Sequence, residues 1–102
     1  MTEKRKPTYD LEAFKAATPR MRVTVVAARS ATALGFGRAE IVATIKGMQR
    51  SQFYKSMTSY VDHRIWQDVY HVPSPAGVLY VKFTADAVAE FSLLSFKEKD
   101  ND

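Results

Sequence analysis

The chain has 102 residues, which fit one compact domain over residues 1–102, and its 46% hydrophobic content is that of a folded globular protein. It contains no cysteine and only two histidines, which excludes disulfides and thiolate metal sites and leaves a zinc site unconvincing. The formal charge of +4 favours polyanionic partners such as nucleic acid, and the absence of a membrane-length apolar run or secretory signal predicts a cytoplasmic protein.

The first 26 residues predict one helix and one strand after a charged N-terminus. Residues 1–6 are mostly charged, and we expect them to be frayed. Asp10 is a suitable N-cap for a short helix that carries apolar side chains at Leu11, Phe14 and Ala17. Pro19 ends this helix, because the residue before a proline is pushed away from helical dihedral angles. Residues 21–26 alternate and become β-branched, which predicts a short strand.

Two further helices are predicted between this strand and residue 50. Residues 27–34 are rich in alanine and favour a helix, which Gly35 would end. Gly37 then opens a clearer helix, whose apolar stripe consists of Ile41, Val42, Ile45 and Met48.

The second half of the chain predicts a four-stranded meander. Its β-like segments are residues 53–60, 65–72, 78–84 and 91–97. Turn-forming residues separate them at 62–64, at 73–77 and around Asp86. Connections this short favour antiparallel hairpins. Helices followed by a meander indicate an α+β domain, with N-terminal helices packed on one face of an antiparallel sheet.

The run FYKSMTSYVDHRIWQDVY, residues 53–70, is richer in hydrogen-bonding and aromatic side chains than is usual for a core strand. Metal-free RNA cleavage uses such groups: the ribose 2′-OH attacks the adjacent phosphate, and the protein supplies a base, an acid and positive charge. Strand alternation groups four candidates with their neighbours, while leaving open whether the four faces coincide. The groups are Lys55 with Phe53 and Met57, Gln67 with Ile65 and Val69, Tyr80 with Val78 and Lys82, and Lys97 with Ser95 and Leu93.

The candidates also have ordinary structural explanations. Lys55 and Lys97 could only solubilise strand edges, and Tyr80 could be a core aromatic. Gln67 is harder to explain in this way, because an amide in an apolar strand needs a hydrogen-bonding partner. If Lys55 and Lys97 lie close together, their mutual repulsion should lower their pKa values and make one of them a suitable base.

The order and spacing of four motifs resemble the MqsR-type mRNA interferase toxins of the RelE-like superfamily. The motifs are FYKSMTSY, DHRIWQDVY, LYVK and SFKEK, all between residues 53 and 99. The N-terminal half is similar only in element order, and residues 83–94 depart from the family pattern. The resemblance implies a RelE-like toxin fold and a ribosome-independent endoribonuclease that cleaves single-stranded mRNA at GC-containing triplets.

The resemblance also implies which residues act. The family's functional residues fall on Lys55, Gln67, Tyr80 and Lys97. In these positions Tyr80 and Lys97 are candidates for proton transfer, and Lys55 would stabilise the pentacoordinate phosphate. Gln67 would orient the phosphate or the ribose.

RNA contacts and partners follow from the same resemblance. Tyr60, Trp66 and Tyr70 are expected to stack on unpaired bases, with His63 in a supporting role. We expect no metal or other cofactor in the toxin. Its partner would be a cognate antitoxin that contains zinc and binds DNA.

Two other functions compete with this prediction. The same sheet could carry a non-catalytic module that binds RNA or a protein partner. A conventional RNase would use two histidines, here His63 and His71. These residues lie at opposite ends of the predicted strand 65–72, which spans roughly 20 Å, so one phosphate could hardly be held by both.

Overall fold

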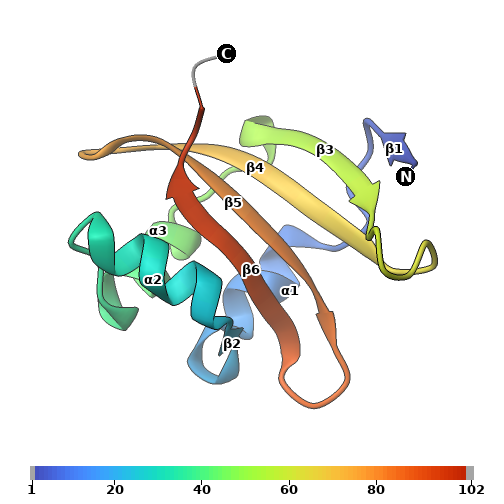
Figure 1. Cartoon of the computed structure of the whole chain (residues 1–102), viewed down its shortest axis with the longest axis horizontal. Coiled ribbons are helices and arrows are strands. Elements are labelled where there is room, and N and C mark those ends of the chain that lie inside the picture. Colours follow the sequence, from blue (N-terminus) through green and yellow to red (C-terminus); the bar gives the residue numbers. More distant parts are fainter. Residues whose placement is uncertain (1, 101–102) are drawn as a thin grey trace.

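Across residues 2–100, which the computed structural model describes, the strands form one sheet in the order β1-β3-β4-β5-β6-β2 (Figure 1). The strands are β1 (Glu3–Lys4), β2 (Arg22–Val23), β3 (Phe53–Thr58), β4 (Trp66–Ser74), β5 (Gly77–Asp86) and β6 (Glu90–Glu98). Neighbouring strands from β1 to β6 run antiparallel, and β2 pairs in parallel with β6. The predicted α+β fold and its meander are confirmed.

The three α-helices of the described residues are α1 (Leu11–Ala16), α2 (Val25–Ala33) and α3 (Arg38–Lys46), and two short 3-10 helices lie at Thr18–Arg20 and Arg50–Gln52. α1 begins as predicted, since the carboxylate of Asp10 accepts a hydrogen bond from the backbone N–H of Glu12 at 3.1 Å. α2 ends before Gly35, whose φ of 86° is a conformation that glycine adopts without steric cost. None of the helices within residues 2–100 is long and apolar enough to cross a membrane.

The predicted strand over residues 21–26 was too long. Only Arg22 and Val23 pair with β6, and Val25 already begins α2. The reason is the side chain of Thr24, whose hydroxyl accepts a hydrogen bond from the N–H of Ala27 at 3.2 Å and so caps the helix. This cap outweighs the β-propensity of the valines that follow, which lie 66% and 67% exposed in the first turn of α2.

The N-terminal segment is also more ordered than expected, from Thr2 onward; Met1 lies outside the described residues. β1 pairs with β3, so that Glu3 lies opposite Met57. Thr2 and Thr58 strengthen this pairing, because the N–H of each donates a 2.8 Å hydrogen bond to an oxygen of the other. The charge of residues 1–6 predicted fraying, because charge and alternation give no information about backbone pairing with the edge strand β3.

The helices cover one face of the sheet and form the core with it. α1 packs on β5 through Phe14 and Phe83, whose rings stack with centroids 3.7 Å apart. The strands contribute the side chains that point toward the helices, all of them buried: Tyr70, Val72, Leu79, Val81, Phe83, Phe91, Leu93 and Phe96. Figure 1 shows α2 beside β6 and α1 crossing the sheet near β5 and β6.

A buried carboxylate joins the N-terminal segment to β4. Asp68 is fully buried and accepts hydrogen bonds from the backbone N–H groups of Thr8, at 3.1 Å, and of Tyr9, at 2.9 Å. The hydroxyl of Tyr9 donates in turn to the carbonyl of Trp66 at 2.9 Å. The aspartate of the WQDVY motif is therefore a structural residue that fixes the chain before α1.

Candidate functional site

A β-bulge in β6 decides where Lys97 points. Lys82 pairs with Ser95, but the next residue, Phe83, pairs with Leu93, so Leu94 is an extra residue in β6. Leu93 is buried in the core, whereas Lys97 follows the buried Phe96 and lies on the opposite face. The prediction that Lys97 shares a face with Leu93 is therefore wrong, because simple alternation fails across the bulge.

A second irregularity shapes β3. Phe53 pairs with Tyr70 and Lys55 with Val69, so Tyr54 is an extra residue between them. Phe53 packs edge-on against Tyr70 on the helix side, at 5.5 Å between ring centroids. Lys55 does not share this face, contrary to the alternation. Tyr54 instead stacks on the imidazole of His71.

These bulges bring the four predicted catalytic residues to one face of the sheet, which we call the open face because it points away from the helices. Cross-strand pairing and alternation place Lys55, Gln67, Tyr80 and Lys97 there, together with Tyr54, Val69, His71, Lys82 and Ser95. The four candidate residues, for which the sequence left a common face open, therefore lie on the same face of the sheet.

A row of rings crosses the open face from β3 to β6. His71 pairs with Tyr80, and Tyr80 pairs with Lys97. The ring of Tyr54 lies 4.2 Å from that of His71, and the ring of His71 lies 6.2 Å from that of Tyr80. The Nζ of Lys97 is 5.3 Å from the centre of the Tyr80 ring. We call these four residues the aromatic row.

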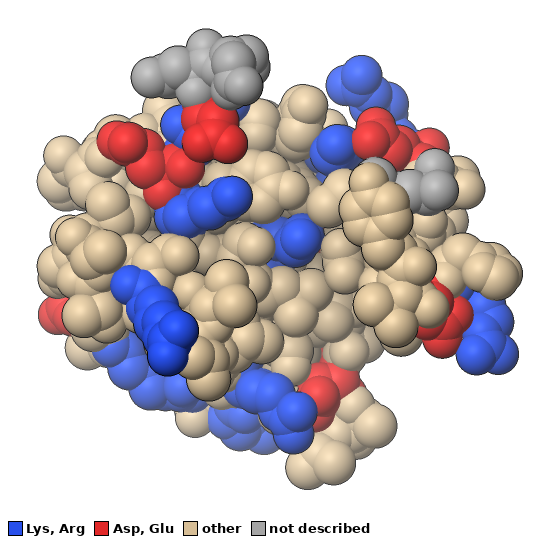
Figure 2. All heavy atoms as spheres, viewed as in Figure 1, with Lys and Arg blue, Asp and Glu red and all other residues tan. Residues whose placement is uncertain are grey.

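The aromatic row lines a cavity of about 490 Å³, whose remaining walls are Lys99 and Asp100. An adjoining cavity of about 300 Å³ shares His71 and Lys99 and is bounded by Gly77, Val78 and Glu98. On the face shown in Figure 2, lysine and arginine side chains reach the middle, and the acidic side chains lie nearer the margin. Such a surface can bind a phosphate beside flat groups that stack on bases.

Lys55 lies on the open face but is already paired. Its Nζ donates a 2.9 Å hydrogen bond to the carboxylate of Glu3 on β1. This bond raises the pKa of Lys55 above its ordinary value of 10.5. The lowering expected from a neighbouring lysine is therefore wrong for Lys55, because Glu3 stabilises the protonated amine. Lys55 can supply positive charge but is a poor base.

Burial affects two other groups of the open face in opposite senses. It raises the pKa of the Tyr80 hydroxyl, which therefore keeps its proton at neutral pH. Burial, together with the positive charges of Lys97 and Lys55, lowers the pKa of Lys82. The cross-strand neighbour of Lys82 is Val69, fully buried although it lies outside the helix-side core. Lys82 therefore lies on the open face opposite this valine, and its amine is close enough to Lys97 and Lys55 for their charges to act on it.

Gln67 is separated from the aromatic row along β4. It lies four residues before His71, which is roughly 13 Å along a strand, and it does not line either cavity beside the row. Its strand partner is Met57 of β3. The structure therefore unites Tyr80 and Lys97, places Lys55 nearby with Glu3, and leaves Gln67 toward the other end of the open face.

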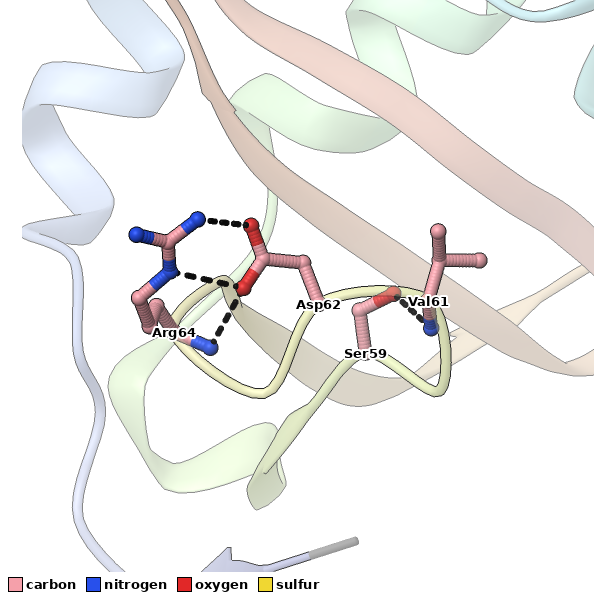
Figure 3. A network of polar contacts seen from close by, with 4 residues as sticks. All are labelled: Ser59, Val61, Asp62 and Arg64. Atoms are coloured by element: carbon pink, nitrogen blue, oxygen red, sulfur yellow. Dashed lines mark hydrogen bonds and ion pairs between the residues drawn. The ribbon is translucent and has the colours of Figure 1, made fainter.

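The predicted base-stacking residues do not form one surface. Tyr60 is 87% exposed and lies with the exposed His63 in the connection between β3 and β4. Figure 3 shows what orders this turn: the carboxylate of Asp62 accepts hydrogen bonds from the backbone and the guanidinium of Arg64. The Arg64 contacts lower the pKa of Asp62, and the Ser59 hydroxyl accepts from the N–H of Val61 at 3.2 Å.

Trp66 and Tyr70 lie on the other side of β4. Trp66 alternates with Asp68 and Tyr70, and the Nζ of Lys4 is 4.3 Å from the centre of its ring. Tyr70 is fully buried in the core, and burial raises its pKa to about 12. The expectation that Tyr70 stacks on RNA is thus incorrect, since its ring is packed between Phe53 and Phe83.

Sequence reasoning missed Tyr54 and undervalued His71. Tyr54 reaches the open face only because of the bulge in β3, which strand composition does not reveal. His71 was placed at the end of a strand, but β4 continues to Ser74 and makes it an interior residue. Its spacing from Gln67 and Val69 was the available signal, because residues i, i+2 and i+4 share a face.

Comparison with known proteins shows the family to which the chain belongs. The family model described as "Motility quorum-sensing regulator, toxin of MqsA" matches residues 6–98. The chain belongs to the MqsR toxin family. One relative, the mRNA interferase toxin MqsR of Escherichia coli (strain K12), is 39% identical over 99 residues, covering 95% of this chain and 99% of that protein. The matched region of the MqsR family model includes the whole aromatic row and the strands that carry it.

Proposed function

We propose that this protein is a toxin that acts as a ribosome-independent endoribonuclease on single-stranded mRNA, with a preference for GC-containing triplets. Membership of the MqsR family and the name of its E. coli relative support the activity. The structural observation that carries the proposal is the pairing of Tyr80 with Lys97 beside a cavity on the open face. These two sequence-predicted residues come together there although they lie on different strands, β5 and β6.

The reaction that suits these groups is transesterification within the RNA. The ribose 2′-oxygen bonds to phosphorus, the bond from phosphorus to the 5′-oxygen breaks, and a proton reaches the leaving 5′-oxygen. Tyr80 holds its proton and can donate it or a hydrogen bond. Lys97 and Lys55 supply positive charge for the non-bridging oxygens. The products are a 2′,3′-cyclic phosphate and a 5′-hydroxyl, and this scheme requires no metal or cofactor.

Substrate positioning involves the rest of the open face. Gln67 is proposed to contact ribose or phosphate at some distance from the bond that breaks, given its separation from the aromatic row. Tyr60 and His63, both exposed, are available to a longer RNA. The ring of Trp66 is engaged by Lys4, so its contact with RNA would require that side chain to move.

The family also suggests the biological setting. We propose a cognate antitoxin of the MqsA type that contains zinc and binds DNA, and a cytoplasmic location where mRNA is available. Such an antitoxin can silence the toxin by covering the open face or by binding elsewhere on the fold.

Incubation of the purified protein with a defined RNA in EDTA, followed by mapping of cut sites and end groups, tests the proposal. Cuts that leave 2′,3′-cyclic phosphates and 5′-hydroxyls are expected for the wild type. Tyr80→Phe and Lys97→Ala should stay folded and lose cleavage. Lys46→Ala removes the same charge from the exposed end of α3 and should cleave normally. A folded wild type that binds RNA without cutting it would favour the non-catalytic binding module instead.

A further inference from the structure

The proposed reaction needs an acceptor for the 2′-OH proton, and the residues assigned so far are poorly suited. Tyr80 keeps its proton because it is partly buried. The amine of Lys55 is held in its charged form by Glu3. Lys97 is needed as positive charge beside the phosphate. A group in the same cavity that is neutral near pH 7 is required.

His71 occupies the centre of the aromatic row. Tyr54 stacks on one side of its ring at 4.2 Å and Tyr80 lies on the other at 6.2 Å. It lines both cavities of the open face. Within residues 2–100 neither imidazole nitrogen has a hydrogen-bond partner, whereas stacking restrains the plane of the ring. The ring is thus positioned with its nitrogens free for a ligand.

We propose that His71 is the general base of the cleavage reaction, an inference that rests on the proposed RNase function. In this step an imidazole nitrogen takes the proton of the ribose 2′-OH as the 2′-oxygen bonds to phosphorus. The bond to the 5′-oxygen breaks, and that oxygen receives a proton from Tyr80 or Lys97 across the row. No oxidant, metal or additional reactant enters, and the proton on His71 returns to water after product release.

The surrounding charges support this role. Burial is the largest cause that lowers the pKa of His71 below 6.5, and the positive charges of Lys99 and Lys55 act in the same sense. The groups that face His71 come from each neighbouring element: Tyr54 and Lys55 from β3, Tyr80 and Lys82 from β5, Lys97, Glu98, Lys99 and Asp100 from β6 and its extension. The imidazole is consequently neutral, and able to accept a proton, at neutral pH.

This mechanism differs from the two-histidine RNase that the sequence allowed. His63 is exposed in the connection between β3 and β4, outside both cavities of the open face. One histidine therefore acts alone, with the acid supplied by the tyrosine and lysine of the neighbouring strands. His63 accordingly offers a matched control, because its replacement removes the other imidazole of the chain.

The test is the pH dependence of kcat/KM for a short RNA, measured for wild type, His71→Gln and His63→Gln. For the wild type we expect an acid limb of unit slope that reports a pKa below 6.5. His71→Gln should lower kcat at pH 7 by about 100-fold or more, with little change in KM, and should lose the acid limb. His63→Gln should keep the limb where it is.

Chemical rescue keeps the proposal falsifiable. In His71→Ala, added imidazole should restore part of the cleavage, since the truncation leaves space between Tyr54 and Tyr80; thermal unfolding and circular dichroism must show that the variant is folded. A His71→Gln enzyme that keeps the acid limb and cleaves within tenfold of wild type would overturn the assignment. If that occurs while Lys97→Ala is inactive, the RNase function stands. A wild type that never cleaves RNA defeats the proposed function itself.

Discussion

Two parallel rows of residues cross the sheet one position apart, and they have opposite characters. Tyr70, Val81 and Phe96 pair across β4, β5 and β6 and are fully buried against the helices. Their sequence neighbours form the aromatic row on the open face, where His71, Tyr80 and Lys97 pair in the same way. A single residue step thus separates the part of each strand that holds the fold from the part available for chemistry.

The comparison teaches that the two faces are subject to different physical constraints. On the helix side, shape and apolar area determine stability, and nearly every polar atom there has a partner; among the described residues the buried Tyr70 hydroxyl lacks one. On the open face, three lysines and two partly buried rings lie close together. Crowding like charges there costs stability but provides a site for a polyanion.

The largest expected effect is the contrast between adjacent residues of β6. Phe96→Ala should lower the free energy of unfolding by about 3–5 kcal/mol, because it opens a cavity in a packed core. Lys97→Ala should change it by less than about 0.5 kcal/mol and instead abolish RNA cleavage. Denaturant unfolding together with a cleavage assay checks both. If Lys97→Ala unfolded the protein as severely, the two faces would not be functionally distinct.

The second-largest effect on stability is expected at Asp68, the buried carboxylate on the helix side of the sheet. Asp68→Ala leaves the partly buried N–H groups of Thr8 and Tyr9 without an acceptor, and we expect the free energy of unfolding to fall by about 2–4 kcal/mol. Hydrogen exchange should also become faster in residues 7–10. An unchanged unfolding midpoint would mean that Asp68 does not fix the N-terminal segment. Asp68→Asn, which keeps an acceptor oxygen, should lose less.

The open face has a converse exception in Lys82, whose charge is unfavourable where it lies. Since its folded pKa is lowered, the unfolded chain binds the proton more tightly, and the penalty is fully present below that folded pKa. It disappears as the pH rises toward 10.5. Lys82→Met should therefore raise stability at pH 7 by up to about 1 kcal/mol and weaken RNA binding. Unfolding curves at pH 7 and pH 10.5 measure the gain and its disappearance.

The smallest effect is expected at the ion pair between Glu3 and Lys55. Glu3→Gln should reduce stability by about 0.2–1 kcal/mol, and the contribution of the pair should also fade above pH 10.5, as Lys55 loses its proton at a raised pKa. Freed from the carboxylate, Lys55 should bind RNA phosphate better, by up to about fivefold. Titration with a non-cleaved RNA measures this, and weaker binding would indicate that Glu3 positions Lys55.

Sequence reasoning predicted those parts of the fold that depend on local signals. Asp10 and Gly35 marked helix ends correctly because caps act within a few residues. The motifs also selected residues that share a face. The faces of Lys55 and Lys97 could not be predicted from alternation, because a β-bulge precedes each of them in its strand. Such a bulge becomes visible only from the pairing with the neighbouring strand. The prediction that Tyr70 stacks on RNA was wrong for a similar reason, because its burial depends on helices that are distant in sequence.

The bulge at Leu94 has a consequence for how relatives of this chain are aligned. It lets β6 point Phe91 and Leu93 toward the helices before the bulge and Phe96 toward them after it. Leu93 and Phe96 are three positions apart, and regular alternation would put them on opposite faces. A relative with one residue fewer here would have to bury its lysine or expose its phenylalanine. Insertions and deletions between β5 and the SFKEK motif should therefore be placed by which face each residue occupies, since a gap shifted past Leu94 would exchange a position on the open face for a core position.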